Sequence, residues 1–130
     1  MHPYRATRVS EKNELKEQAT VIEEAREKLP KRLKVLKNIA FVEHPEASLG
    51  IMAFYAAVVS GMRVGVAIEV KDGWAVMSLR AKDPRVDLNS LLRNIAPSFK
   101  GHGGGHRSAA GARVPLENLT AFLSALDESL

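Results

Sequence analysis

Apolar positions along the chain change repeatedly between a helical spacing and a strand-like spacing, which predicts that helices and strands alternate. The predicted helices are Ser10–Leu29, Ala47–Ser60, the segment between Asp87 and Pro97, and the segment from Pro115 to Leu130. The predicted strands are Asn38–Glu43, Arg63–Val70, Trp74–Arg80 and Ala110–Val114. This order predicts an α/β fold in which a mixed sheet of about four to five strands is flanked by helices.

Residues that start or stop helices stand at several of these limits. Asp87 can cap the helix that follows it, and Pro97 stops that helix. Gly61 can end the helix before it, and Pro115 suits the first position of the last helix. The segment Ala47–Ser60 is apolar nearly all round, so we expect a buried helix packed on the sheet.

Asp72-Gly73 stands between two apolar runs and predicts an antiparallel hairpin with a two-residue turn. This turn fixes a register in which one face is apolar, through the pairs Val70–Ala75, Ile68–Met77 and Val66–Leu79. On the other face, Ser78 lies opposite Ala67 and Arg80 lies opposite Gly65. Such small neighbours leave room for a ligand to lie against the strands. The alternative is an arginine on a solvated face.

The Ser10–Leu29 helix carries only a narrow apolar stripe, made of Leu15, Ala19, Ile22, Ala25 and Leu29. Because a short helix is marginal by itself in water, this stripe is expected to fold back on the domain, pair with a second copy or dock on another domain. The heptad-like spacing of Leu15, Ile22 and Leu29 favours a homodimer. We divide the chain into an N-terminal extension with a linker-like helix, residues 1–37, and a domain over residues 38–130.

Composition bounds the class of protein. A length of 130 residues suits one domain, and a hydrophobic fraction of 45% suffices for a core. The chain has no cysteine, which excludes disulfides and cysteine-based metal sites and favours a cytoplasmic location. No apolar leader is evident at the N-terminus, and the longest apolar run, Leu49–Val59, is too short to cross a membrane.

The net charge of +4 favours anionic partners without identifying them. A basic run follows Pro30 and consists of Lys31, Arg32, Lys34 and Lys37. This run either forms a patch for nucleic acid or is a solvated face of the protein.

The segment Lys100–Gly111 holds the candidate chemistry. Gly103, Gly104 and Gly105 are followed directly by His106. Successive backbone N–H groups in a glycine-rich turn can form an anion-binding concavity, and a histidine adds a further donor. The segment therefore predicts a cradle for phosphate or carboxylate, although many glycine-rich turns are only loop punctuation.

These motifs, in this order, resemble the DHH-associated domain of the first type. That domain is the C-terminal substrate-binding domain of DHH-family phosphoesterases such as RecJ-type exonucleases and nano-RNases. The resemblance runs from about Asn38 to Leu126 and rests on Gly103–His106, on the Ala-Ala-Gly sequence after it and on Ser78–Arg80 before it. His102 is a departure, because many relatives carry a small residue there, and it implies a narrower or more basic site.

The resemblance implies a site for the phosphate of a single-stranded oligonucleotide or a nucleotide. Its implied residues are Gly103, Gly104, Gly105 and His106, assisted by Ser78 and Arg80. Three further cations are secondary candidates for the same ligand: Lys82, Lys100 and Arg107.

No catalytic centre is expected in this chain. The resembling enzymes hydrolyse their substrates in another domain, whose aspartates and histidines hold Mn²⁺ or Mg²⁺. The present chain has aspartates only at Asp72, Asp83, Asp87 and Asp127. His102 and His106 are four residues apart, but that spacing suits a metal on a helix and not in a glycine loop. We therefore expect no metal and no cofactor in this chain.

Three functions stay open on the sequence. The first is a phosphate- or nucleic-acid-binding module of a DHH-type phosphoesterase, either as a fragment or as a stand-alone protein. The second is an interaction subunit that docks on a catalytic partner through the stripe from Leu15 to Leu29. The third is a relative of the tRNA-binding and dimerising C-terminal domain of alanyl-tRNA synthetases and their editing proteins, against which His106 argues because that branch more often ends its glycine run with arginine than with histidine.

Overall fold

The computed structural model describes residues 19–130. A mixed sheet of six strands forms its centre, in the order β1-β2-β3-β4-β6-β5. The strands are β1 (Lys34–Val35), β2 (Ile39–Glu43), β3 (Val64–Lys71), β4 (Trp74–Ala81), β5 (His102–Gly105) and β6 (Ala109–Pro115). The α-helices are an N-terminal helix over residues 19–32, α2 (Leu49–Ser60), α3 (Leu88–Ile95) and α4 (Leu119–Glu128), and the short 3-10 helices are η1 (Ala96–Phe99) and η2 (Leu116–Asn118).

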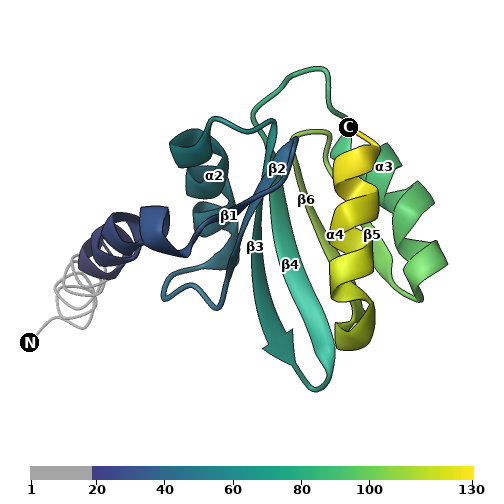
Figure 1. The fold of residues 1–130 in the computed structure, drawn as a ribbon, viewed down its shortest axis with the longest axis horizontal. Coiled ribbons are helices and arrows are strands. Elements are labelled where there is room, and N and C mark those ends of the chain that lie inside the picture. Colours follow the sequence, from purple (N-terminus) through teal and green to yellow (C-terminus); the bar gives the residue numbers. More distant parts are fainter. Residues whose placement is uncertain (1–18) are drawn as a thin grey trace, which may run out of the picture.

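The helices cover both faces of the sheet, which confirms the α/β class (Figure 1). Strands β2 and β3 are parallel and are joined by α2, whereas every other strand pair is antiparallel. Helix α2 lies on one face, and α3 and α4 lie on the other (Figure 1). The larger apolar cluster, which includes Val66, Leu79, Leu92 and Phe122, fills the space between the sheet and α3 and α4.

The hairpin of β3 and β4 has the register that the sequence predicts. Ile68 pairs with Met77, and Gly65 pairs with Arg80. Asp72 and Gly73 both have positive φ, 53° and 80°, as a tight two-residue hairpin turn requires. The alternation therefore sends Leu79 into the core and leaves Ser78 and Arg80 on the face that carries α2.

Gly65 sets how closely α2 approaches the sheet. A Cβ atom at this position would lie 2.0 Å from the Ala53 carbonyl oxygen and 2.5 Å from the Ala57 backbone nitrogen. Both obstacles are backbone atoms of α2, so no side-chain rotation could relieve the clash. The glycine therefore brings α2 into direct contact with β3 and places the start of α2 beside β4.

The N-terminal helix folds back on the domain over the residues that the structure describes. Ala25 and Leu29 are buried in a second apolar cluster with Met52 of α2 and Val42 of β2. This observation matches the fold-back alternative. The homodimer that the heptad-like spacing favours stays a prediction, and Leu15 of that stripe lies outside the described residues.

Several element limits differ from the sequence-based prediction. The last helix does not begin at Pro115, which ends β6, because η2 separates the two elements. Helix α2 is not buried all round, since Phe54 is 53% exposed. The glycine segment is strand β5 and not a free loop, and β1 forms the opposite edge of the sheet. Both added strands are edge strands too short or too glycine-rich to show an apolar alternation.

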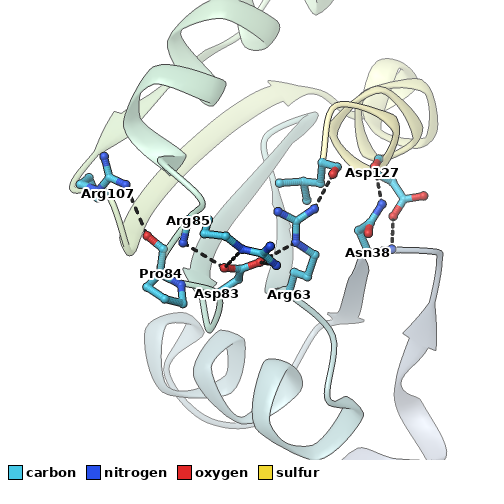
Figure 2. Close-up of polar contacts among 8 residues, drawn as sticks. Asn38, Arg63, Asp83, Pro84, Arg85, Arg107 and Asp127 are labelled. Atoms are coloured by element: carbon cyan, nitrogen blue, oxygen red, sulfur yellow. Dashed lines mark hydrogen bonds and ion pairs between the residues drawn. The ribbon is translucent and has the colours of Figure 1, made fainter.

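A buried carboxylate ties α4 to the start of β2. Asp127 is only 6% exposed. Its carboxylate accepts hydrogen bonds from the backbone N–H groups of Lys37 at 3.2 Å, Asn38 at 2.6 Å and Ile39 at 3.2 Å. The Asn38 amide in turn donates to the Asp127 carbonyl oxygen at 3.0 Å (Figure 2). One side chain thus satisfies the N–H groups of a tight turn that the sheet leaves unpaired.

A second carboxylate, Asp83, fixes the segment that follows β4 (Figure 2). It accepts hydrogen bonds from Arg63 Nε at 2.8 Å, from Arg85 Nη2 at 2.9 Å and from the Arg85 backbone N–H at 2.9 Å. These hydrogen bonds, led by that of the Arg85 side chain, hold the pKa of Asp83 well below its usual range. Arg63 also donates to the Leu130 carbonyl oxygen, so the cluster reaches the C-terminal end of the described chain.

We expect Asp127→Ala to lower the free energy of unfolding by about 1 to 3 kcal/mol, because it leaves buried backbone N–H groups without an acceptor. Urea denaturation followed by circular dichroism measures this change. Glu128→Ala is the control, since Glu128 neighbours Asp127 on α4 but is exposed. Equal stabilities of the two variants would contradict the structural role of Asp127.

Asp83 makes the stability depend on pH at the acid end. Its pKa is depressed in the folded state, so its contribution is complete above the unfolded-state pKa and is lost as the pH falls below about 4. Asp83→Asn is therefore expected to destabilise the protein at pH 7, with a difference from the parent that shrinks below that pH. Asp72→Asn, in the exposed hairpin turn, is the control for the charge change. A pH-independent difference would count against the ion-pair cluster.

Candidate functional site

Three neighbouring strands, β4, β6 and β5, bring Ser78, Arg80, Gly104 and His106 onto one face of the sheet, whereas Gly103 and Gly105 pair with Ala112 and Ala110, which face the core. Arg80 pairs with Ala109, and Ala109 accepts a hydrogen bond from the His106 N–H at 2.9 Å. Side chains paired directly across strands point to the same face. Arg80, Ala109 and His106 therefore form one row, with two strand spacings of about 4.8 Å each between Arg80 and His106.

The next row towards the centre of the face is made almost wholly of small residues. Ser78 pairs with Gly111, and Gly111 pairs with Gly104. The two glycines contribute no side chain, so the middle of the face is lower than its ends. The small neighbours that the sequence predicts for Arg80 on β3 thus continue on β6 and β5.

A third row closes the other end of this face. Val76 pairs with Arg113, and Arg113 pairs with His102. The guanidinium of Arg113 stacks on the Trp74 ring at 4.2 Å from its centroid, which holds the cation in place. An open hollow of about 400 Å³ lies here, and its lining includes Val76, His102, Gly111 and Arg113.

We call this region the open sheet face and define it by Ser78, Arg80, His102, His106, Gly111 and Arg113. Helix α2 packs on β2, β3 and β4. His102, His106 and Arg113 are exposed, whereas Arg80 is half-buried at the border with α2. The face is therefore low in the middle, with Arg80 and His106 at one end and Arg113 and His102 at the other.

The glycine segment owes its composition partly to packing against α3. A Cβ atom at Gly103 would lie 2.8 Å from Leu92 Cβ, and one at Gly104 would lie 3.1 Å from Asn89 Oδ1. Gly104 and Gly105 have φ of 156° and 148°, which favours glycine over residues with a side chain. The run thus lets an edge strand and a helix approach closely, a role that the sequence did not reveal.

The backbone N–H groups of this segment do not all point the same way. The His106 N–H donates to β6, and because alternate N–H groups of an edge strand face its partner, the Gly104 N–H also points to β6. Those of Gly103 and Gly105 point away from the sheet. The Gly105 N–H donates to Asn89 Oδ1 at 3.1 Å, so this donor is already satisfied within the protein.

The candidate cations differ in how they are held. Arg107 forms an ion pair with Asp87 at 3.5 Å and donates to the Pro84 carbonyl oxygen at 3.3 Å. The pKa of Asp87 is lowered, chiefly by hydrogen bonds from Ser90. Arg80 donates only to the Leu79 carbonyl oxygen, and it forms no ion pair among residues 19–130. The charge of Arg80 is thus available to a ligand, whereas that of Arg107 is partly neutralised.

The two lysine candidates lie at opposite ends of the open sheet face. Lys82 follows β4 just beyond Arg80, and its N–H donates to the Arg63 carbonyl oxygen. Lys100 ends η1 with a positive φ of 61°, just before β5. Both side chains are exposed.

Within the described range, no group of three or more histidine, cysteine, aspartate or glutamate residues could hold a metal ion. Over the same residues, none of the helices has the length and apolar character needed to cross a membrane. The aspartates instead have structural positions: Asp72 in the hairpin turn, Asp83 between arginines, Asp87 at the start of α3 and Asp127 under the β1–β2 turn.

Arg113 belongs to the open sheet face and stacks on Trp74, but neither residue was found from the sequence. The hairpin register was predictable because Asp72-Gly73 fixes it, but the pairing of β4 with β6 joins segments about thirty residues apart with no turn between them to set the register. The sequence did contain a signal for Arg113, namely the alternation along β6. Ala110, Ala112 and Val114 face the core, so Arg113 lies on the opposite face.

Solved structures share this fold. The pGpG-specific phosphodiesterase PggH from Vibrio cholerae aligns with a TM-score of 0.66 at 14% identity, over 91% of the present chain and 41% of its own. RecJ from Thermus thermophilus aligns with a TM-score of 0.61 at 19% identity, over 87% and 18%. The C-Ala domain of alanyl-tRNA synthetase from Aquifex aeolicus reaches a TM-score of 0.47 at 13% identity, over 73% and 97%.

No curated protein sequence matches the chain. The chain spans less than half the length of the phosphodiesterase and about a fifth of that of RecJ. The family model of the DHHA1 domain matches residues 37–130, which is most of the sequence. The fold, the paired strands under the glycine segment and this match lead to one conclusion, that the chain belongs to the DHHA1 domain family.

Proposed function

We propose that the open sheet face binds the phosphate groups of a short single-stranded oligonucleotide or a nucleotide, as the substrate-binding part of a DHH-type phosphoesterase. The observation that carries this proposal is the row of Arg80, Ala109 and His106 beside the row of Ser78, Gly111 and Gly104. An unpaired arginine and an exposed histidine stand next to a surface without side chains. The row thus offers one donor at each end of this surface to the phosphate groups of a ligand.

Each residue has a distinct part in this proposal. Arg80 supplies a fixed positive charge and a planar set of donors suited to phosphate. His106 supplies a ring N–H, and Ser78 a hydroxyl group. Gly104 and Gly111 supply space, and the N–H of Gly103 is the glycine donor that points away from β6. The Gly105 N–H contributes only if a ligand displaces Asn89.

Charges farther out on the face extend the site along a nucleic acid strand. Arg113 on Trp74 and His102 lie two rows from Arg80, and Lys100 lies just beyond them. Successive phosphates of a single strand are spaced widely enough to use both ends of such a face, and cations along a groove that tracks the backbone are typical of single-strand binding. Lys82 adds a charge at the Arg80 end.

The family and the names of two relatives supply the class of ligand. PggH is named for its action on pGpG, a short oligonucleotide, and RecJ has been described as an exonuclease. Both have more than half of their length outside the aligned region. We therefore propose that catalysis with Mn²⁺ or Mg²⁺ belongs to a DHH catalytic domain that acts with this one, in cis or in trans, in the cytoplasm. No observation favours an interaction subunit or a tRNA-binding role over this proposal.

Arg80→Ala and His106→Ala are each expected to weaken binding of a 5′-phosphorylated oligonucleotide by about 1 to 3 kcal/mol, the range for a hydrogen bond to a charged group. Fluorescence anisotropy on a short labelled strand and calorimetry with pGpG measure the affinity. Binding is expected to weaken with added salt, because each phosphate contact releases counterions.

Lys28→Ala is the matched control for this experiment, because it removes one exposed positive charge of the N-terminal helix that pairs with Glu46 and belongs neither to the open sheet face nor to the basic run after Pro30. Its affinity is expected to stay close to that of the parent chain. If Lys28→Ala and Arg80→Ala weaken binding equally, the attraction comes from net charge and the proposed site is wrong.

The chain by itself is expected to leave pGpG and short oligonucleotides intact in the presence of Mn²⁺. The physical reason is that no cluster of histidines and acidic residues within residues 19–130 could hold a metal ion, and that Asp83, Asp87 and Asp127 are bound to structural partners. Chromatography of the products after long incubation tests this expectation. Hydrolysis that co-purifies with the protein and disappears in His106→Ala would refute it.

A further inference from the structure

An open groove lies between the N-terminal helix and the start of α2, next to the open sheet face. Its volume is about 530 Å³, within the range of small-molecule sites. The lining is apolar on one side, with Ile22, Ile51, Phe54 and Tyr55, and polar on the other, with Ser48 and Arg80. A groove of this composition suits a ligand that has both a flat apolar part and an anionic part.

Arg80 belongs to both sites. Its backbone lies in the row with Ala109 and His106, while its guanidinium reaches the first turn of α2. There, a Cβ atom on Gly50 would lie only 2.7 Å from Arg80 Nη2. The absence of a side chain at Gly50 is therefore what lets the guanidinium lie between the groove and the open sheet face.

The aromatic wall is held in place on one side and free on the other. The Tyr55 ring lies under Arg26 at 5.3 Å and contacts the Phe54 ring at a centroid distance of 5.8 Å. Phe54 is 53% exposed, although an aromatic ring on a surface helix gains more from burial than from water. Its exposed side thus offers a surface on which a flat ring can stack.

We propose that this groove binds a nucleobase of the ligand, stacked on Phe54, while Arg80 holds the adjoining phosphate. The inference rests on the proposed function, because it extends the same ligand by one base. Stacking on an aromatic side chain tolerates any base, so the groove gives affinity for nucleotides over inorganic phosphate without sequence preference. Ser48, at the start of α2, lines the same groove and offers its hydroxyl group to the edge of the base.

Two ligands with the same phosphates separate this proposal from the proposed function. They are pGpG and its abasic analogue, and calorimetry on the full chain measures both affinities. Phe54→Ala is expected to weaken pGpG binding about tenfold and to leave the abasic ligand unaffected. Val58→Ala, an exposed apolar residue of α2 that does not line the groove, is the control and is expected to change neither.

The outcomes distinguish the two proposals. If Arg80→Ala weakens binding of both ligands but Phe54→Ala changes the two affinities equally, the phosphate site stands and the base groove is wrong. If neither ligand binds the parent chain, or if Arg80→Ala changes neither affinity, the phosphate site itself is wrong and the groove falls with it.

Gly50→Ala gives a second test that keeps the aromatic residues Phe54 and Tyr55 of the groove. The added methyl group displaces the end of a flexible side chain, Arg80, and Ala is the better helix former, so the free energy of unfolding is not expected to fall. Affinity for both ligands is expected to fall severalfold, because the guanidinium loses its place. Unchanged affinity with unchanged stability would overturn the role of Arg80 as the shared anchor.

Discussion

The contact between Gly65 and α2 is the constraint on which the rest of the structure depends. Because backbone atoms of Ala53 and Ala57 occupy the place of a side chain at Gly65, α2 lies directly on β3. This contact packs α2, which connects the parallel strands β2 and β3, closely on the sheet. It also places the first turn of α2 beside Arg80 on β4. A helix held farther from the sheet would leave that arginine in solvent and would open the groove beside it.

The distribution of charge follows from which carboxylates are used inside the fold. Asp127 satisfies backbone N–H groups under the β1–β2 turn, and Asp83 is shared by Arg63 and Arg85. These interactions lie at the ends of strands and helices, where backbone or arginine donors need an acceptor. Arg80 and Arg113 form no ion pair with any described residue, so both guanidinium groups keep their charge available to a ligand.

The glycine segment serves packing and the candidate site together. Gly103 and Gly104 make room for Leu92 and Asn89 of α3, and Gly111 leaves the middle row of the open sheet face low. The same lack of side chains thus admits a helix from one side and leaves room for a ligand on the other. A glycine-rich sequence read only as a flexible loop would miss that it forms an edge strand with a defined register.

Local patterns in the sequence determined the hairpin register, the cap at Asp87, the apolar core positions and the residue types of the candidate site. These features depend on interactions between near neighbours, which a short segment contains in full. The tertiary structure decided that Arg80 and His106 share a row, that Arg113 joins them, and that the Gly105 N–H is satisfied by Asn89. It also decided that Phe54 stays exposed beside Arg80. These features depend on how β4 pairs with β6 and how closely helices pack on the sheet, which contacts between distant segments set.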